Sequence, residues 1–576
     1  GLPLALELAA PQLRIHSPRQ LRHGLERQLD VLAGGKLDRP TRHQSLRACI
    51  DWSYSLLPLG QQTILQYLSV FENGFTLESA NCVLGQMEPF EKCLVLSRSD
   101  GSGDQFFRES ILALAEQFMI TCADWGAAHL RFKLPDSIRE FARAKLEASC
   151  RSSALRDAHL AWCLSIAEES VSKIYTAEEH EWIDHLSREE ANLESALRWS
   201  LAQENGMQRE RGLLLAAALT DFWYVTGRYA TGRRWLNCGI TLARGGEPSI
   251  GAARCYVGAC QIEQTQALVK PAAEHCEAGL KMATMVDDPL ALGRGLLFSG
   301  NLALARDQVG EARRLHEAAL GVFTGQQWPA WRSLALLNLG IDAIRDGRPG
   351  QAGPLVSEAL EIACSIGDRW EMMNATFVLG DIALAEGDLV TAETLFVDYA
   401  TIARHLDSGR DLADALAGLA EVFLAMRVPR RAACVAAAAE ALFQRHGIHM
   451  PPPLRPNWIS ITSETRAQLA AANPPMSWPT VDLAEFIENL LGNRRDWQRS
   501  FRRQHRPKVV VRKSLRSSDQ VHESRESIRA RHTSSKAHRP VGDRLKRQAQ
   551  FVSLDFAGAG TRPDLMLAPN IGSNGA

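Results

Sequence analysis

The sequence predicts a mainly α-helical protein whose largest part is a stack of paired helices. Small residues recur with a period of 40 between residues 206 and 447, and apolar residues around them follow helical spacing. The chain has 576 residues, of which 45% are hydrophobic and 23% are charged. This composition is typical of a soluble globular protein with several domains.

The small residues of the repeat occupy three offsets in each period. The first set is Gly300, Gly340, Gly380 and Ala420. The second set lies twelve residues later, at Ala312, Ala352, Ala392 and Ala432, with Ala272 and Gly232 in the same register. The third set lies seven residues further on, at Gly239, Gly279, Ala319, Ala359 and Ala439, and Tyr399 is its exception. We expect short side chains there because the two antiparallel helices of a unit approach closely at these points.

These spacings resemble the tetratricopeptide repeat, in a version with longer helices. About six units fit between residues 206 and 447. Glycines Gly227, Gly347 and Gly387 fall where one helix is expected to stop and the next to begin. Such stacks have a concave inner face, which we expect to bind a protein or small-molecule ligand, although a purely structural spacer is the alternative.

The segments that flank the repeats also show helical spacing. Residues 151–205 are predicted to form a helical linker, and residues 448–493 a short helical segment after the prolines at 451–453.

The amino-terminal part carries motifs of a known class. The string Gly1-Leu2-Pro3 resembles the Gly-x-Pro motif of the STAND class of signal-transduction ATPases, and residues 42–57, 65–71 and 74–78 look like the winged-helix portion of the large LuxR-type regulators in that class. The resemblance implies that residues 1–36 end a nucleotide-binding module in which Pro3 packs near the adenine. It implies a winged-helix domain at residues 37–150.

The end of this predicted domain includes one further candidate site residue. We expect a strand at residues 130–134 and a helix that begins near Asp136, with the Asp136 side chain placed to cap it. By resemblance, Leu134-Pro135-Asp136 falls where relatives carry a Met-His-Asp sensor of bound ADP. Pro135 stands at the histidine position, so a phosphate contact by that side chain is excluded, and Asp136 stays open between a nucleotide contact and a helix cap.

The resemblance covers roughly residues 1–450 and, with the repeat, predicts the whole fold class. It is mainly α: a winged-helix domain, then an αα-superhelix of tetratricopeptide-like repeats, then a basic tail. The implied function is the signal-sensing part of an ATP-dependent bacterial transcriptional regulator, in which the winged helix clamps the nucleotide domain and does not itself bind DNA. Two alternatives stay open, namely a non-enzymatic repeat adaptor or scaffold and the regulatory C-terminus of a kinase or cyclase.

No motif of an independent enzyme is visible in the sequence. ATP chemistry needs GxxxxGK[ST], which the sequence does not contain, and GxSxG, HExxH and EF-hand patterns are also missing. We therefore expect ATP or ADP to bind in a full-length parent and not tightly to this chain alone. Because the first residue is Gly1 and not methionine, we expect the chain to be part of a longer gene product.

The remaining composition predicts a cytoplasmic protein without a membrane span or a metal site. The 12 cysteines occur singly, with no CxxC pair and no zinc spacing, as expected in a reducing compartment. No stretch approaches the roughly 18 apolar residues that would span a bilayer.

The tail at residues 494–576 differs from the rest of the chain. Between Arg494 and Arg547 there are 18 lysines or arginines against 5 aspartates or glutamates. Its low apolar content predicts disorder, and its charge would favour sequence-independent contact with nucleic acid. A shifted reading frame that replaced a DNA-reading domain is an equally open explanation of the tail.

Overall fold

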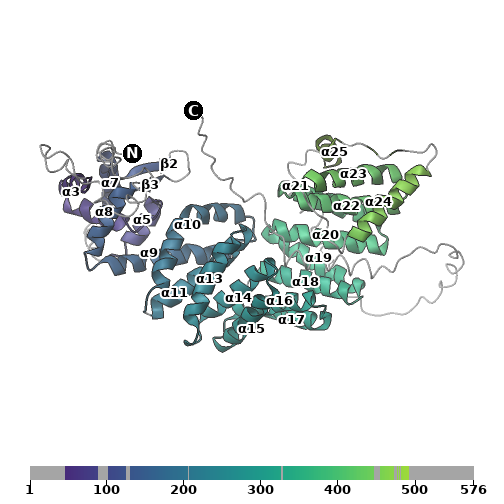
Figure 1. The fold of residues 1–576 in the computed structure, drawn as a ribbon, viewed down its shortest axis with the longest axis horizontal. Helices are drawn as coiled ribbons and strands as arrows, with labels where there is room; N and C mark the ends of the chain where they lie inside the picture. Colours follow the sequence, from purple (N-terminus) through teal and green to yellow (C-terminus); the bar gives the residue numbers. More distant parts are fainter. Residues whose placement is uncertain are drawn as a thin grey trace, which may run out of the picture. The chain divides into compact units, whose positions relative to one another are not determined.

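The computed structural model describes residues 46–87, 102–124, 130–204, 206–325, 328–445, 455–471, 477, 479 and 482–491 (Figure 1). The chain forms two compact units. The first comprises the described residues up to Ser170 together with Asp184–Ala218, and the second comprises Val171–Ile183 and the described residues from Leu219 onward. The division falls within helix α10 (Glu179–Leu201).

The first unit combines helices with a small antiparallel sheet. Its strands are β1 (Phe75–Thr76), β2 (Thr121–Asp124) and β3 (Arg131–Lys133), in the order β1-β3-β2. The helices of this part are α3 (Leu46–Ser55), α4 (Leu59–Leu68), α5 (Leu77–Leu84), α7 (Ser102–Glu116) and α8 (Asp136–Glu147). They are followed by α9 (Ser152–Val171), α10 and α11 (Gly206–Ala218).

Polar contacts fix the sheet to helix α10 inside the first unit. Arg131 of β3 donates from Nη2 to Oε2 of Glu189 at 3.1 Å. The side chain of Asn192 donates to the carbonyl of Gly74 at 3.2 Å and accepts from the backbone N–H of Glu72 at 2.7 Å. Gly74 has φ +106°, and a Cβ there would lie 2.5 Å from the carbonyl oxygen of Phe132, so only glycine fits this turn.

The expected strand at residues 130–134 is β3, but the expected cap of the next helix is wrong. Pro135 is the N-cap residue of α8, and no side-chain hydrogen bond caps the helix. Asp136 is instead the first helical residue, and its carboxylate lies 3.3 Å from the guanidinium of Arg139. The fixed φ of Pro135, −54°, already directs the chain into the helix, which moves the boundary one residue earlier than the aspartate suggests.

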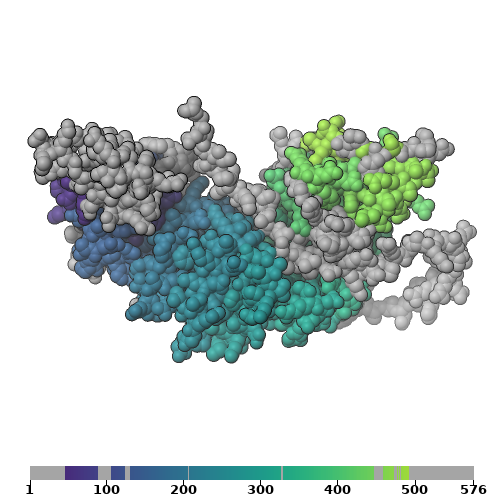
Figure 2. All heavy atoms as spheres, viewed as in Figure 1, coloured from purple at the N-terminus to yellow at the C-terminus, as the bar shows by residue number. Residues whose placement is uncertain are grey.

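The second unit is a stack of helical pairs. The first helices of the pairs, called A helices here, are α14 (Ile250–Thr265), α16 (Pro289–Ala305), α18 (Pro329–Arg345), α20 (Arg369–Glu386) and α22 (Gly409–Ala425). The second, called B helices, are α15 (Val269–Met285), α17 (Val309–Thr324), α19 (Pro349–Ile366), α21 (Leu389–His405) and α23 (Pro429–Arg445). Helix α13 (Tyr229–Ala243) precedes the first pair and packs against α14. Successive A helices touch one another, and each also packs against its own B helix. The side chains of α14 to α18 fill the spaces between the ribbons (Figure 2).

Further helices flank this stack along the chain. Helix α12 (Thr220–Val225) precedes α13, and α24 (Arg455–Ala470) and α25 (Leu483–Leu491) pack against α23.

The structure confirms that small residues mark the close approach of paired helices. A Cβ on Gly300 would collide with the ring of His316, and a Cβ on Gly340 would collide with Val356, each on the following B helix. The alanines of the second set are completely buried: Ala272, Ala312, Ala352, Ala392 and Ala432. The turn glycines Gly227, Gly347 and Gly387 have φ of +69°, +76° and +81°, as expected where helices end.

Candidate ligand-binding pocket

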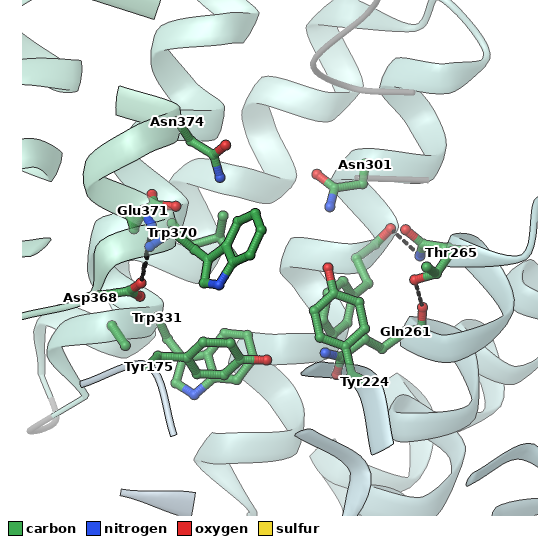
Figure 3. Close-up of a pocket in the computed structure, with 14 residues that line it drawn as sticks. Tyr175, Tyr224, Gln261, Thr265, Asn301, Trp331, Asp368, Trp370, Glu371 and Asn374 are labelled. Carbon is green, nitrogen blue, oxygen red and sulfur yellow. Dashed lines mark hydrogen bonds between the residues drawn. The ribbon is translucent and has the colours of Figure 1, made fainter. Parts of the chain in front are cut away.

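A cavity of about 120 Å³ lies on the A-helix side of the second unit (Figure 3). Four A helices, α14 to α20, contribute to it, together with Tyr224 of α12 and with Tyr175, which precedes α10. The lining residues are Tyr175, Tyr224, Gln261, Gln264, Thr265, Phe298, Asn301, Ala330, Trp331, Leu334, Asp368, Trp370, Glu371 and Asn374. The volume is close to that of a cavity of roughly 150 Å³ that accommodates a benzene molecule, so one small ligand or one side chain fits.

Aromatic rings form much of the pocket wall. The ring of Trp331 lies edge to face with that of Tyr175, with centroids 5.6 Å apart, and with that of Phe298 at 6.3 Å. The indole of Trp370 projects from α20 toward the middle of the pocket (Figure 3). These rings give a ligand apolar surface and π faces to contact.

Tyr175 reaches the pocket on a strained backbone. Its φ is +70°, in the left-handed region that a bulky residue seldom adopts. The conformation is held at both ends, because the N–H of Tyr175 donates to Glu179 at 3.1 Å and the N–H of Ala177 donates to the carbonyl of Ile366 at 3.0 Å. The hydroxyl of Tyr175 donates to Asp221 at 3.2 Å, so the whole side chain is fixed in place.

A buried ion pair supports the floor of the pocket. The guanidinium of Arg294 donates to both carboxylate oxygens of Asp221, at 2.9 and 3.1 Å, and to the side-chain carbonyl of Gln261. Its Cζ also lies 4.3 Å from the centroid of the Trp331 ring. Both charges are almost completely buried, so the positive charge of Arg294 is already matched inside the protein.

A second polar cluster orients Asn301. Its Oδ1 accepts from Nδ2 of Asn338 at 3.0 Å and lies 3.1 Å from Nε2 of His316. His316 in turn lies 2.6 Å, through Nδ1, from the carboxylate of Asp342. Because the amide oxygen of Asn301 is engaged in this cluster, its NH2 group is the part left to donate to a ligand. Asn301 and Asn374 lie on opposite sides of the pocket (Figure 3).

Two carboxylates stand at the start of α20. Asp368 is the N-cap residue, and its Oδ1 accepts from the backbone N–H groups of Trp370 and Glu371 at 3.1 and 3.0 Å. Glu371 is 6% exposed, and its Oε1 has no hydrogen-bond partner among the described residues. Burial, and then the nearby charge of Asp368, raise the pKa of Glu371 well above its usual value, against a smaller opposite effect of a hydrogen bond with Asn374.

The first unit has a cavity of its own, of about 280 Å³. Its polar side chains bond to one another, so we assign it a structural role and not a ligand. Its charged residues are paired within the unit: Arg143 donates to Glu72 at 2.7 Å, and Arg156 donates to Glu147 at 2.8 Å. Burial lowers the pKa of His159 in its wall to about 4, so this ring is neutral and packs between Phe71 and Trp162.

The pocket does not contain either site residue named from the sequence. Pro3 lies outside the described residues. Asp136 belongs to the first unit, where its side chain is 79% exposed. The sequence predicted a binding face on the repeats but no individual residues of it. Trp331, Trp370 and Glu371 interrupt the pattern of small and aliphatic residues in the A helices, and this interruption could have indicated the pocket.

The described residues show neither a metal-binding group nor a membrane-spanning helix. No cluster of three or more histidine, cysteine, aspartate or glutamate residues in the described ranges could hold a metal ion. No helix in the same part of the chain is long and apolar enough to cross a membrane.

Similar proteins are named as regulators of transcription. The chain is 28% identical over 422 residues, 68% of its length and 43% of theirs, to "Putative HTH-type transcriptional regulator Rv0890c" of Mycobacterium tuberculosis and to its Mycobacterium bovis counterpart Mb0914c. It is 31% identical over 155 residues to the uncharacterized protein Rv0894 of M. tuberculosis, covering 27% of this chain and 36% of that protein. The chain thus spans less than half the length of the curated relatives it matches.

No family model matches the chain. Among solved structures, a STAND protein with a tetratricopeptide repeat sensor, PH0952 from Pyrococcus horikoshii, aligns with a TM-score of 0.49 and 13% identity over 88% of this chain and 72% of that one.

Proposed function

We propose that this chain is the signal-sensing part of an ATP-dependent bacterial transcriptional regulator. In this proposal the repeats bind a small molecule or a protein segment, and a winged-helix part in the first unit couples that event to an ATPase domain outside this chain. The observation that carries the proposal is the pocket on the A helices, because it combines aromatic surface with a buried carboxylate oxygen that nothing within the described residues satisfies.

Sequence similarity supports the regulatory setting. The chain covers 43% of relatives that are named as putative HTH-type transcriptional regulators, so DNA binding by the whole protein is part of the proposal. Nucleotide binding by the whole protein is proposed from the sequence motifs alone. The proposed winged-helix part is supported by its set of elements, which combines several helices with a small three-stranded antiparallel sheet. These elements are α3, α4, α5, α7, α8 and the sheet β1-β3-β2. We assign that domain a coupling role and no DNA contact of its own.

The path of the chain suggests how binding is transmitted. Tyr175 lines the pocket four residues before α10 begins, and the later residues Glu189 and Asn192 of the same helix bind Arg131 and Gly74. A ligand that displaces Tyr175 would therefore act on the start of the helix that supports the sheet. Displacement of Tyr175 would break its hydrogen bonds to Glu179 and Asp221, and the release of its left-handed backbone conformation would offset part of that cost.

Thermal unfolding tests whether the pocket senses a ligand. The small-molecule fraction of a bacterial extract is added to the wild-type chain, to Trp370→Ala and to the control Val390→Ala, whose exposed side chain lies on α21. We expect the fraction to stabilise the wild type and the control but not Trp370→Ala; a ligand at a hundred times its Kd adds about 2.7 kcal/mol. The same fraction should then change ATP hydrolysis by the longer gene product only when the pocket is intact.

Two results would overturn the proposal. Equal stabilisation of all three proteins would place the ligand elsewhere, and ATP hydrolysis that ignores a ligand bound in the pocket would leave the repeats as an adaptor without a sensing role.

A further inference from the structure

The pocket lining has a charge pattern that favours a positively charged ligand. Among the fourteen residues that line it there are two carboxylates, Asp368 and Glu371, and no lysine, arginine or histidine. The nearest buried cation described above, Arg294, is already neutralised by Asp221 through two hydrogen bonds. An anionic ligand would therefore find no free positive charge in the lining, whereas a cation would find the Oε1 atom of Glu371, which has no partner among the described residues.

Comparison with the next repeat shows that the unsatisfied carboxylate is a local feature. Asp411 occupies the position equivalent to Glu371, 40 residues later, and is partly buried. Its Oδ1 accepts from the hydroxyl of Tyr399 at 3.0 Å, and its Oδ2 accepts from the hydroxyl of Ser408. The repeat can thus satisfy both oxygens of an acid at this position from within, whereas Oε1 of Glu371 has no partner among the described residues and the one hydrogen bond to this carboxylate comes from Asn374.

The aromatic wall provides the second requirement of a cation site. The Cζ of Arg294 lies 4.3 Å from the centroid of the Trp331 ring, so one cationic group of the protein already packs on a ring of this wall. Trp370, Tyr175 and Tyr224 add further rings around the open space (Figure 3). Rings that surround a cation replace part of its hydration at small cost, and a nearby carboxylate balances its charge.

We infer that the pocket binds the alkylammonium group of its ligand, against the aromatic rings and beside the carboxylate of Glu371. This inference rests on the proposed function and names the chemistry of the ligand. The volume of about 120 Å³ fits one alkylammonium chain, which comes either from a free small amine or from a lysine side chain of a protein segment.

Binding of a cation should release a proton. Burial and Asp368 raise the pKa of Glu371, so its carboxyl group binds a proton more tightly in the empty pocket than it would in water. An ammonium group next to it favours the ionised form, and the proton then leaves to solvent. A group that had only a structural role would not couple ammonium binding to proton release.

Isothermal titration calorimetry of the full chain tests the inference with n-butylammonium, neutral n-butanol and anionic butyrate. We expect n-butylammonium to bind at least tenfold more tightly than the other two, and its heat to vary with the ionisation enthalpy of the buffer in the direction of proton release. Glu371→Gln should lose at least tenfold in affinity for n-butylammonium and lose the buffer dependence. Asp411→Asn, the matched change one repeat later, should leave both unchanged.

A further titration with a lysine-containing peptide distinguishes the two sources of the ammonium group. The peptide Gly-Gly-Lys-Gly is compared with n-butylammonium: tighter binding of the peptide indicates a protein segment, and equal or weaker binding indicates a free amine. Binding of n-butanol or butyrate in preference to n-butylammonium would overturn the inference and leave a sensing pocket of other chemistry. If none of the three compounds gave a heat of binding, the inference would also be overturned. The proposed function would still be decided by the experiment with the bacterial extract.

Discussion

The two ends of the repeat stack share one scaffold but fill its A-helix side differently. Around α14 to α20, Phe298 and Trp331 border an open cavity. Three repeats after Phe298 the equivalent residue is Gly418, and the ring of Phe396 fills the space, 2.5 Å from where a Cβ at that glycine would lie. The paired helices alone therefore make no site, because the side chains on the A helices decide whether the interior is open or closed.

The first prediction tests whether the scaffold is the same at both ends. Ala352 and Ala432 are equivalent and completely buried, one between the helices that border the pocket and one at the closed end. Ala352→Arg and Ala432→Arg should each lower the free energy of unfolding by about 3 to 5 kcal/mol, because a long charged side chain cannot be accommodated between packed helices. Urea denaturation measures the loss.

Gln351→Arg is the control, because residue 351 is exposed beside Ala352. It should change stability by less than about 0.5 kcal/mol. A large loss at only one of the two alanines would show that the ends of the stack do not share the same packing.

Local patterns in the sequence were sufficient to predict the scaffold. Short side chains at Gly300 and Gly340, and turn glycines such as Gly387, repeat because every pair of helices meets in the same way. The strand at β3 was also predicted. The boundary at Asp136 was wrong by one residue, because the backbone of Pro135 and not the acidic side chain begins the helix.

The pocket could not be predicted in the same way, because its residues depend on contacts distant in sequence. Tyr175 enters from outside the repeats on a left-handed backbone that periodicity does not reveal. Glu371 and Asp411 occupy equivalent positions, but the hydroxyls of Tyr399 and Ser408 donate to both oxygens of Asp411, whereas Oε1 of Glu371 has no partner among the described residues. The interruption of the small-residue pattern at Tyr399 was visible in the sequence, but its purpose as a donor to Asp411 required the structure.

The second prediction compares these two acids through nearly isosteric apolar substitutions. Asp411→Leu should lower the free energy of unfolding by about 1 to 3 kcal/mol, because it leaves the buried hydroxyl of Tyr399 without its acceptor. Glu371→Met should be close to neutral or stabilising, because Oε1 loses no partner among the described residues. Thermal or urea unfolding of the two variants measures the difference, and equal losses would show that both acids have the same structural role.

The last prediction concerns the dependence of stability on pH, whose effect over a fraction of a pH unit is the smallest of the three. The pKa of Glu371 is raised in the folded chain above its ordinary value of 4.5, first by burial and then by Asp368, so the folded state holds the proton more tightly than the unfolded state. The resulting stabilisation is present below about pH 4.5 and is lost as the pH rises through the folded pKa, by up to about 1.4 kcal/mol per pH unit.

Glu371→Gln has no such proton, so its free energy of unfolding relative to the wild type should increase with pH. Asp411→Asn should show a weaker dependence, because hydrogen bonds from Ser408 and Tyr399 lower the pKa of Asp411 against the effect of burial. Urea unfolding at several pH values measures both slopes; parallel curves for Glu371→Gln and the wild type would mean that Glu371 is ionised in the folded protein and has a partner there.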